Sequence, residues 1–112
     1  MEMSVKTAGH ICVVTVEETR IDAPVALAFK DKMRTLTRDA ENRVLLDLTQ
    51  VTFIDSSGLG AIVAVMKHLA PDRKLLLAGL TPAVEKVFNL TRMNSVFTIF
   101  MTLEEALEVE GA

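Results

Sequence analysis

The sequence predicts an α/β fold: a mixed β-sheet whose first hairpin is antiparallel and whose other strands are mostly parallel, packed with about four helices. Apolar segments rich in β-branched residues alternate along the chain with segments whose apolar residues recur every three or four positions. Strands separated by helices favour parallel neighbours. Ala8-Gly9-His10 resembles a tight turn between the first two strands. The chain has 112 residues, 50% of them hydrophobic, which suits one domain spanning residues 1–112.

The first half of the chain carries the signals of three strands and one helix. Asp22 precedes the helical pattern and is expected to be its N-cap, with Pro24 in the first turn. Asp47 interrupts an otherwise apolar strand and either bonds nearby backbone groups or belongs to the site; we favour the structural role. The expected elements are strands at residues 3–8, 10–16 and 43–48, a loop at 17–21, and a helix from Asp22 to about Thr37.

The second half repeats the alternation of strands and helices. Thr102 followed by Glu105 predicts a capping box at the start of the last helix. The expected elements are a strand end at Phe53-Ile54, a helix ending near Leu69-Ala70, a strand at 74–78, a helix from Thr81 to about Leu90, a strand at 95–100, and a final helix after Thr102.

One stretch, Phe53-Ile54-Asp55-Ser56-Ser57-Gly58-Leu59-Gly60, organises the prediction of function. An apolar pair leads into an acid, two hydroxyls and two glycines, which predicts a strand end, a tight turn and a helix start. Asp55 or Ser56 can cap that helix. A phosphate on a hydroxyl there would be favoured by the helix dipole and by the free N–H groups of the first turn. Taken alone, the same stretch is also typical of an ordinary capped helix.

The two glycines of this stretch disfavour a helix, which suggests that their lack of a side chain has a role. Each costs a helix interior about 1 kcal/mol relative to alanine, but leaves room for a close approach. We therefore expect a large residue at Gly58 or Gly60 to impair partner binding more than folding.

Composition and motifs argue against several classes of function. The net charge of −3 disfavours nucleic-acid binding. The chain shows neither a signal-peptide pattern nor an apolar run of about 18 residues. We therefore expect a cytoplasmic protein that neither spans nor binds a membrane. Cys12 is expected to be buried, and His10 and His68 to be exposed. These three residues lack metal-ligand spacing, and no nucleotide-binding motif occurs, so we expect neither a metal nor a cofactor.

A hydrolase is also disfavoured. The G-x-S-x-G pattern is missing, and His10 or His68 would have to reach Ser56 or Ser57 to act as a base. We therefore expect the protein not to be an enzyme.

The string Val44-Leu45-Leu46-Asp47-Leu48, then Asp55 to Gly60, then Leu75 to Ala78 with Gly79-Leu80, resembles the STAS domain of bacterial anti-sigma factor antagonists. The resemblance implies a module that binds an anti-sigma factor when unphosphorylated. We expect it to be a monomer, because the chain is small, carries net charge and has neither a heptad pattern nor a long apolar run. The anti-sigma factor is a serine kinase with a histidine-kinase-like ATPase fold. It would phosphorylate Ser57 and so release the antagonist, and a serine phosphatase would reverse the mark. The implied partner-binding residues are Asp22, Asp55, Ser56, Ser57, Gly58, Leu59 and Gly60.

One segment departs from the family pattern. Antagonists usually carry G-[EQ]-[LI]-D before the first helix, whereas this chain has Thr19-Arg20-Ile21-Asp22. The changed charge puts the identity of the partner in question. The alternative function is a STAS subunit of an ABC-type lipid transport complex, contacting its ATPase without a phosphorylation switch.

Overall fold

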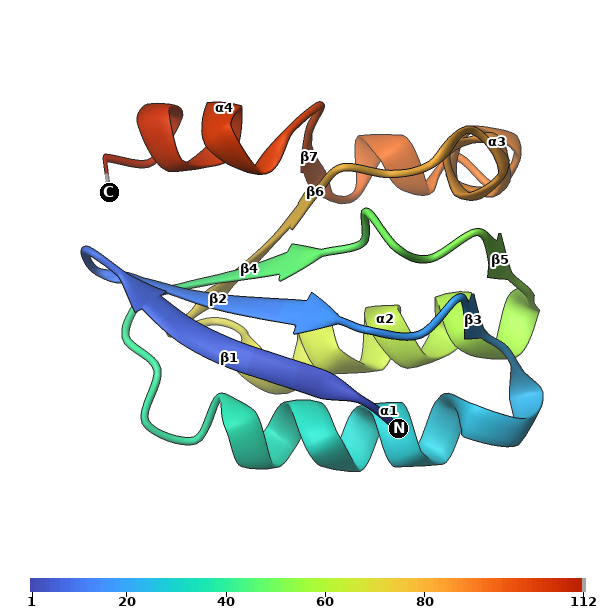
Figure 1. Cartoon of the computed structure of the whole chain (residues 1–112), viewed down its shortest axis with the longest axis horizontal. Helices are drawn as coiled ribbons and strands as arrows, with labels where there is room; N and C mark the ends of the chain where they lie inside the picture. Colours follow the sequence, from blue (N-terminus) through green and yellow to red (C-terminus); the bar gives the residue numbers. More distant parts are fainter. Residues whose placement is uncertain (112) are drawn as a thin grey trace.

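A computed structural model describes residues 1–111 and shows a mixed main sheet, a small second sheet and four α-helices within that range (Figure 1). The strands are β1 (Met3–Ala8), β2 (Ile11–Val16), β3 (Arg20–Ile21), β4 (Arg43–Asp47), β5 (Phe53–Ile54), β6 (Lys74–Ala78) and β7 (Thr98–Phe100). The helices are α1 (Ala23–Leu36), α2 (Ser56–Leu69), α3 (Pro82–Leu90) and α4 (Leu103–Val109), with a short 3₁₀ helix η1 (Met93–Ser95).

The main sheet confirms the predicted fold class. Its strand order is β1-β2-β4-β6-β7. β1 pairs antiparallel with β2, while β2, β4, β6 and β7 run parallel to one another. Val14, Leu46 and Leu77 lie in register across the three central strands. The parallel pairs follow from the helices that separate these strands in the sequence.

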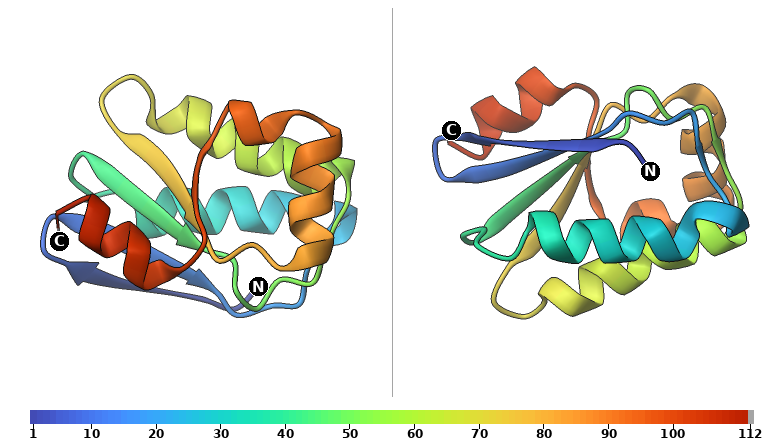
Figure 2. Two further views of the ribbon diagram at one scale, coloured as in Figure 1. Left: turned by 90° about the horizontal axis from the view of Figure 1, so that it is seen from above. Right: turned by 60° about the horizontal axis from the view of Figure 1, so that its bottom comes forward.

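Both faces of the sheet are covered, which explains why its central strands are almost wholly apolar. In β4, Val44 and Leu46 join the larger core beneath α1 and α2, whereas Leu45 points to the opposite face. There it packs with Phe100 of β7 and Ala106 of α4. Figure 2 shows α1 and α2 together on one side of the sheet and α4 on the other. None of the helices described in residues 1–111 is long and apolar enough to span a membrane.

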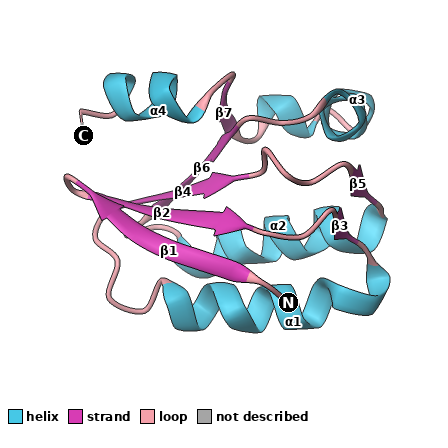
Figure 3. Cartoon of the chain, viewed as in Figure 1, coloured by secondary structure: helices cyan, strands magenta, loops and turns pink. Residues whose placement is uncertain are grey.

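Two predicted segments differ from the structure. The expected loop at residues 17–21 contains strand β3, which pairs in parallel with β5 to form the small sheet seen in Figure 3. A two-residue strand is too short to show a periodic pattern. The last strand begins at Thr98 rather than Ser95, because Ser95 belongs to η1 and donates its hydroxyl to the Arg92 carbonyl.

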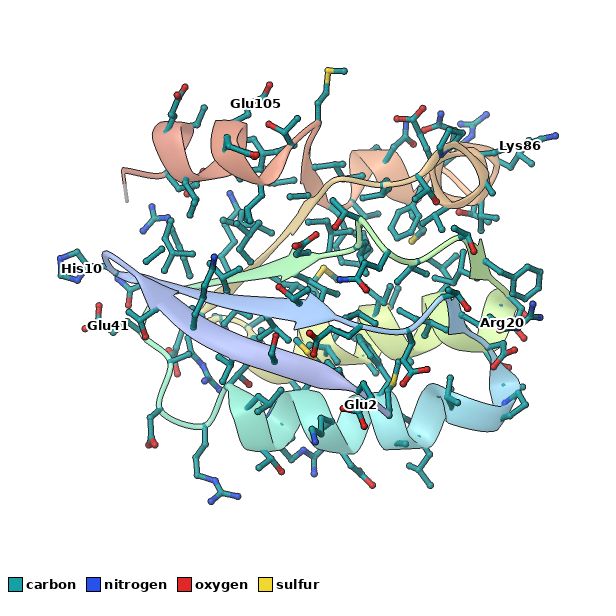
Figure 4. The ribbon with its side chains drawn as sticks, viewed as in Figure 1. Glu2, His10, Arg20, Glu41, Lys86 and Glu105 are labelled. Carbon is teal, nitrogen blue, oxygen red and sulfur yellow. The ribbon has the colours of Figure 1, made fainter. Side chains whose placement is uncertain are left out.

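Several local predictions are confirmed. The Glu105 N–H donates to the Thr102 hydroxyl at 3.0 Å, which is one half of the predicted capping box. The Glu105 carboxylate accepts in return from the Met101 N–H at 3.4 Å, one residue before the expected donor. Cys12 is buried, and that burial raises the pKa of its thiol. The His10 side chain is 89% exposed and lies 3.0 Å from Glu41 at the hairpin end of the molecule (Figure 4). His68 is also exposed.

Asp47 has the structural role that the sequence suggested. Its residue is only 7% exposed, at the end of β4. One carboxylate oxygen accepts bonds from the Thr49 N–H at 3.0 Å and the Thr49 hydroxyl at 2.8 Å, and the other accepts from the Thr15 hydroxyl at 3.4 Å. The carboxylate therefore holds the chain where it leaves the sheet toward β5.

Asp47→Ala should lower the free energy of unfolding by about 1–3 kcal/mol, because it leaves the partly buried donors of Thr49 without their acceptor. Urea denaturation measures the change. Asp72→Ala, at an exposed turn, is the matched control and should stay within about 0.5 kcal/mol of the parent. Equal stability of both variants would show that Asp47 does not brace this turn.

Candidate functional site

Strands β3 and β5 place the first turns of α1 and α2 side by side. They lie beyond the carboxyl ends of β2 and β4 and lead directly into the two helices (Figure 3). Arg20 is in register with Phe53, and Ile21 with Ile54. The Thr19 carbonyl also accepts a bond from the Phe53 N–H at 3.1 Å. Residues far apart in sequence therefore meet at one end of the molecule.

Asp55 caps both helices with one carboxylate. Its Oδ1 accepts a bond from the Gly58 N–H in the first turn of α2 at 2.8 Å. Its Oδ2 accepts a bond from the Ala23 N–H at the start of α1 at 3.0 Å. The bond from Gly58, with a smaller contribution from Ala23, lowers the pKa of Asp55, although desolvation acts in the opposite direction. The carboxylate is therefore ionised at neutral pH, where it complements two positive helix ends.

The prediction that the Asp22 side chain caps α1 is wrong. Asp22 occupies the N-cap position of α1 with extended backbone, but its carboxylate makes no capping bond. It accepts a bond from Arg20 Nε at 2.9 Å instead. Asp55 takes over the capping of α1, because the pairing of β3 with β5 brings it to the Ala23 N–H.

The two glycines of the motif have different roles. A Cβ atom added to Gly58 would lie 1.9 Å from the Ile21 carbonyl oxygen, so the backbones of α2 and β3 approach too closely for any side chain. A Cβ on Gly60 would have no neighbour within 4 Å. The expectation that substitution would spare folding is therefore wrong for Gly58, which is buried by this packing.

The serine hydroxyls lie at the exposed start of α2. Ser56 and Ser57 are the first two residues of the helix and are both exposed. Asp55 supplies the cap, so neither hydroxyl is needed for it. The Gly58 N–H is already bound, so it is not free for a phosphate as the sequence suggested. Leu59 was expected at the partner-binding surface, but it is 9% exposed and packs in the core.

Sequence reasoning missed the surroundings of Arg20. Its guanidinium lies 4.1 Å from the centre of the Phe53 ring and donates to Asp22. The only signal was the departure of the Thr19-Arg20-Ile21-Asp22 segment from the family pattern. Nothing local connects Arg20 with Phe53, because their contact depends on the register of β3 and β5.

The described part of the chain, residues 1–111, brings together no group of three or more His, Cys, Asp or Glu residues that could hold a metal ion. The functional groups at this end of the molecule are therefore the exposed hydroxyls of Ser56 and Ser57, the Asp55 carboxylate and the Arg20 guanidinium.

Fold and site define a small α/β domain that presents two serines at the start of a helix whose capping carboxylate also caps a second helix. The chain belongs to the STAS domain family, whose family model matches residues 2–106.

Relatives and solved structures extend this similarity over most of the chain. The chain is 26% identical over 107 residues to an anti-sigma-B factor antagonist of Staphylococcus aureus, covering 95% of this chain and 86% of that protein. It is similar to an anti-sigma factor antagonist from Mycobacterium paratuberculosis, with a TM-score of 0.86, 25% identity and coverage of 96% and 92%. It also shares its fold with the phosphorylated form of the Bacillus cell fate determinant SpoIIAA, with a TM-score of 0.66, 21% identity and coverage of 96% and 97%.

Gly58→Ala should lower the free energy of unfolding by about 3 kcal/mol, because the new methyl group overlaps the Ile21 carbonyl. Gly60→Ala is the matched control in the same turn. It should raise stability by up to about 1 kcal/mol, because it removes the helix penalty of glycine without a clash. Chemical denaturation of both variants makes the comparison. A Gly58→Ala protein as stable as the parent would contradict this packing.

The double cap should make stability depend on pH in the acid range. Because the pKa of Asp55 is lowered in the folded state, its contribution is complete above the unfolded value of about 3.9 and is lost as the pH falls through the lower folded value. Asp55→Asn offers one carbonyl oxygen and cannot accept at both helices. It should be less stable than the parent at pH 7, and the difference should shrink below about pH 4.

Denaturant unfolding between pH 7 and pH 2.5 measures this difference. Asp39→Asn, at an exposed position after α1, is the matched control and should track the parent throughout. A gap between parent and Asp55→Asn that stays constant down to the lowest pH would exclude the ionised double cap.

Proposed function

We propose that this protein is an anti-sigma factor antagonist controlled by phosphorylation. In its unphosphorylated state it binds an anti-sigma factor through the surface around the start of α2. The anti-sigma factor is also a serine kinase with a histidine-kinase-like ATPase fold. It phosphorylates Ser57, the complex dissociates, and a serine phosphatase restores the binding state.

The observation that carries this proposal is the exposed Ser57 in the first turn of α2, in a STAS domain. The chain is 26% identical to an anti-sigma-B factor antagonist over an alignment that covers 95% of its length. Asp55 uses its own oxygens for both helix caps, so the Ser57 hydroxyl has no structural duty and is accessible to a kinase. SpoIIAA, which has the same fold, has been solved in a phosphorylated form.

Electrostatic repulsion and the cost of dehydration would cause the phosphorylated protein to dissociate from its partner. A phosphate adds about −1.5 to −2 charges next to the ionised Asp55. The Gly58 N–H already serves Asp55, so it cannot also neutralise the phosphate. A partner covering Ser57 would have to dehydrate this dianion. A loss of about 4 kcal/mol would weaken binding roughly a thousandfold.

The protein would act by binding and not by catalysis. Its contact surface includes Ser56, Ser57 and Gly60, which are exposed, together with Asp22 beside Arg20. Gly58 and Asp55 support that surface from beneath by fixing the backbone of the first turn.

Incubation with ATP and the anti-sigma factor captured from the native cell should place one phosphate on Ser57, read by mass spectrometry. Ser57→Ala should bind that factor regardless of ATP, because no phosphate can be added. Ser57→Asp should bind more weakly than the parent, although one carboxylate carries less charge than a phosphate.

Ser56→Ala is the matched control, one residue away and equally exposed, and should still be phosphorylated. A phosphate on Ser56 would overturn the assignment of Ser57. No phosphate on either serine, with the genuine partner present, would favour the transporter-subunit alternative.

A further inference from the structure

Arg20, Asp22 and Phe53 form a small surface cluster, here called the Arg20 cluster. The guanidinium lies over the Phe53 ring at 4.1 Å, within the range of a cation–π contact, and Nε donates to Asp22 at 2.9 Å. Phe53 is 40% exposed, so part of its surface is available to a partner. Figure 4 shows Arg20 at the end of the molecule where β3 and β5 lead into the two helices.

A backbone contact between β3 and α2 connects this cluster with the segment that carries Ser57. Ile21 and Gly58 are in direct contact, as shown by the 1.9 Å that would separate a Gly58 Cβ from the Ile21 carbonyl oxygen. Arg20 precedes Ile21, and Ser57 precedes Gly58, so each is one residue from that contact. The Ile21 side chain is buried, and Arg20 next to it in the strand is exposed.

The ion pair presents its positive end to solvent. The Arg20 side chain is 57% exposed, whereas the Asp22 side chain is only 15% exposed. Within residues 1–111 the guanidinium hydrogen bond runs from Nε to Asp22, which leaves the terminal N–H groups for another acceptor. An approaching surface therefore meets more of the cation than of the carboxylate.

We propose that the Arg20 cluster is a docking site for a carboxylate on the anti-sigma factor, and that it helps to select that partner. This inference rests on the proposed function. An Asp or Glu of the partner would accept from the terminal N–H groups while an apolar neighbour covers the exposed edge of Phe53.

The geometry of the cluster suits this role. The ring and the Asp22 carboxylate hold the guanidinium in place, so less side-chain freedom is lost when a partner binds. Arginine and aromatic residues are common among the side chains that dominate interface energies. A partner with a basic residue at this point would meet like charge, which gives discrimination as well as attraction.

The test measures the affinity of unphosphorylated variants for the purified anti-sigma factor that phosphorylates Ser57. Arg20→Ala should weaken binding about tenfold, and Arg20→Glu about a hundredfold, because it places like charges together. Arg20→Lys should fall between the parent and Arg20→Ala, since it keeps the charge and loses the planar fork. Melting temperatures of all variants check that the fold is kept.

Arg43→Glu is the matched control. Arg43 is 45% exposed in its side chain and is also ion-paired, to Glu110, but it lies at the start of β4, at the opposite end of the sheet. Its replacement should leave affinity unchanged. Lysine replacing single acids on the partner should restore binding to Arg20→Glu at one position, a rescue that a merely structural role could not produce.

Two outcomes distinguish a wrong docking site from a wrong proposed function. If the parent binds and Ser57→Asp does not, but Arg20→Glu binds within twofold of the parent, the docking site is wrong and the proposed function stands. If the parent itself does not bind the anti-sigma factor, the proposed function is wrong and this inference falls with it.

Discussion

The Asp55 carboxylate is the constraint on which the site depends. It is shared between the Gly58 N–H of α2 and the Ala23 N–H of α1, so one side chain ties together two helices that cover the same face of the sheet. The contact of Gly58 with Ile21 completes the tie at the backbone level. Both features restrict the geometry. The two Asp55 bonds need an ionised carboxylate, and the contact with Ile21 needs a residue without a side chain at position 58. The first turn of α2 is consequently held at a defined height above the small sheet.

The residues of this motif form two groups: some fix the backbone of the first turn, and the others are exposed on the surface. Asp55, Gly58 and Leu59 face inward or are committed to backbone bonds, whereas Ser56, Ser57 and Gly60 are exposed. A short sequence can in this way supply both a rigid base and a modifiable surface. Phosphorylation at such a position would change charge without dismantling the fold, which is what a reversible binding switch requires.

The core behind the site accounts for its rigidity. The central strands β2 and β4 are parallel and buried on both faces, and the chain runs from their carboxyl ends into the small β3–β5 sheet. Asp47 fixes the exit of β4 through its bonds to Thr49. The Thr81 hydroxyl donates to the Val51 carbonyl at 2.6 Å and so ties the start of α3 to the same segment. The position of Ser57 is therefore set by the packing of the whole domain.

The main elements, the mixed sheet and the D-S-S-G helix start were predictable because their signals are local. Caps such as Asp55 on Gly58 span three residues, and apolar periodicity spans one element. The second bond of Asp55, to Ala23, the contact of Arg20 with Phe53 and the clash that forbids a side chain at Gly58 were not predictable. Each joins segments more than thirty residues apart, and their meeting depends on the register of two-residue strands that leave no pattern in the sequence. Local chemistry thus specifies which groups the site contains, whereas tertiary packing specifies which of them face a partner.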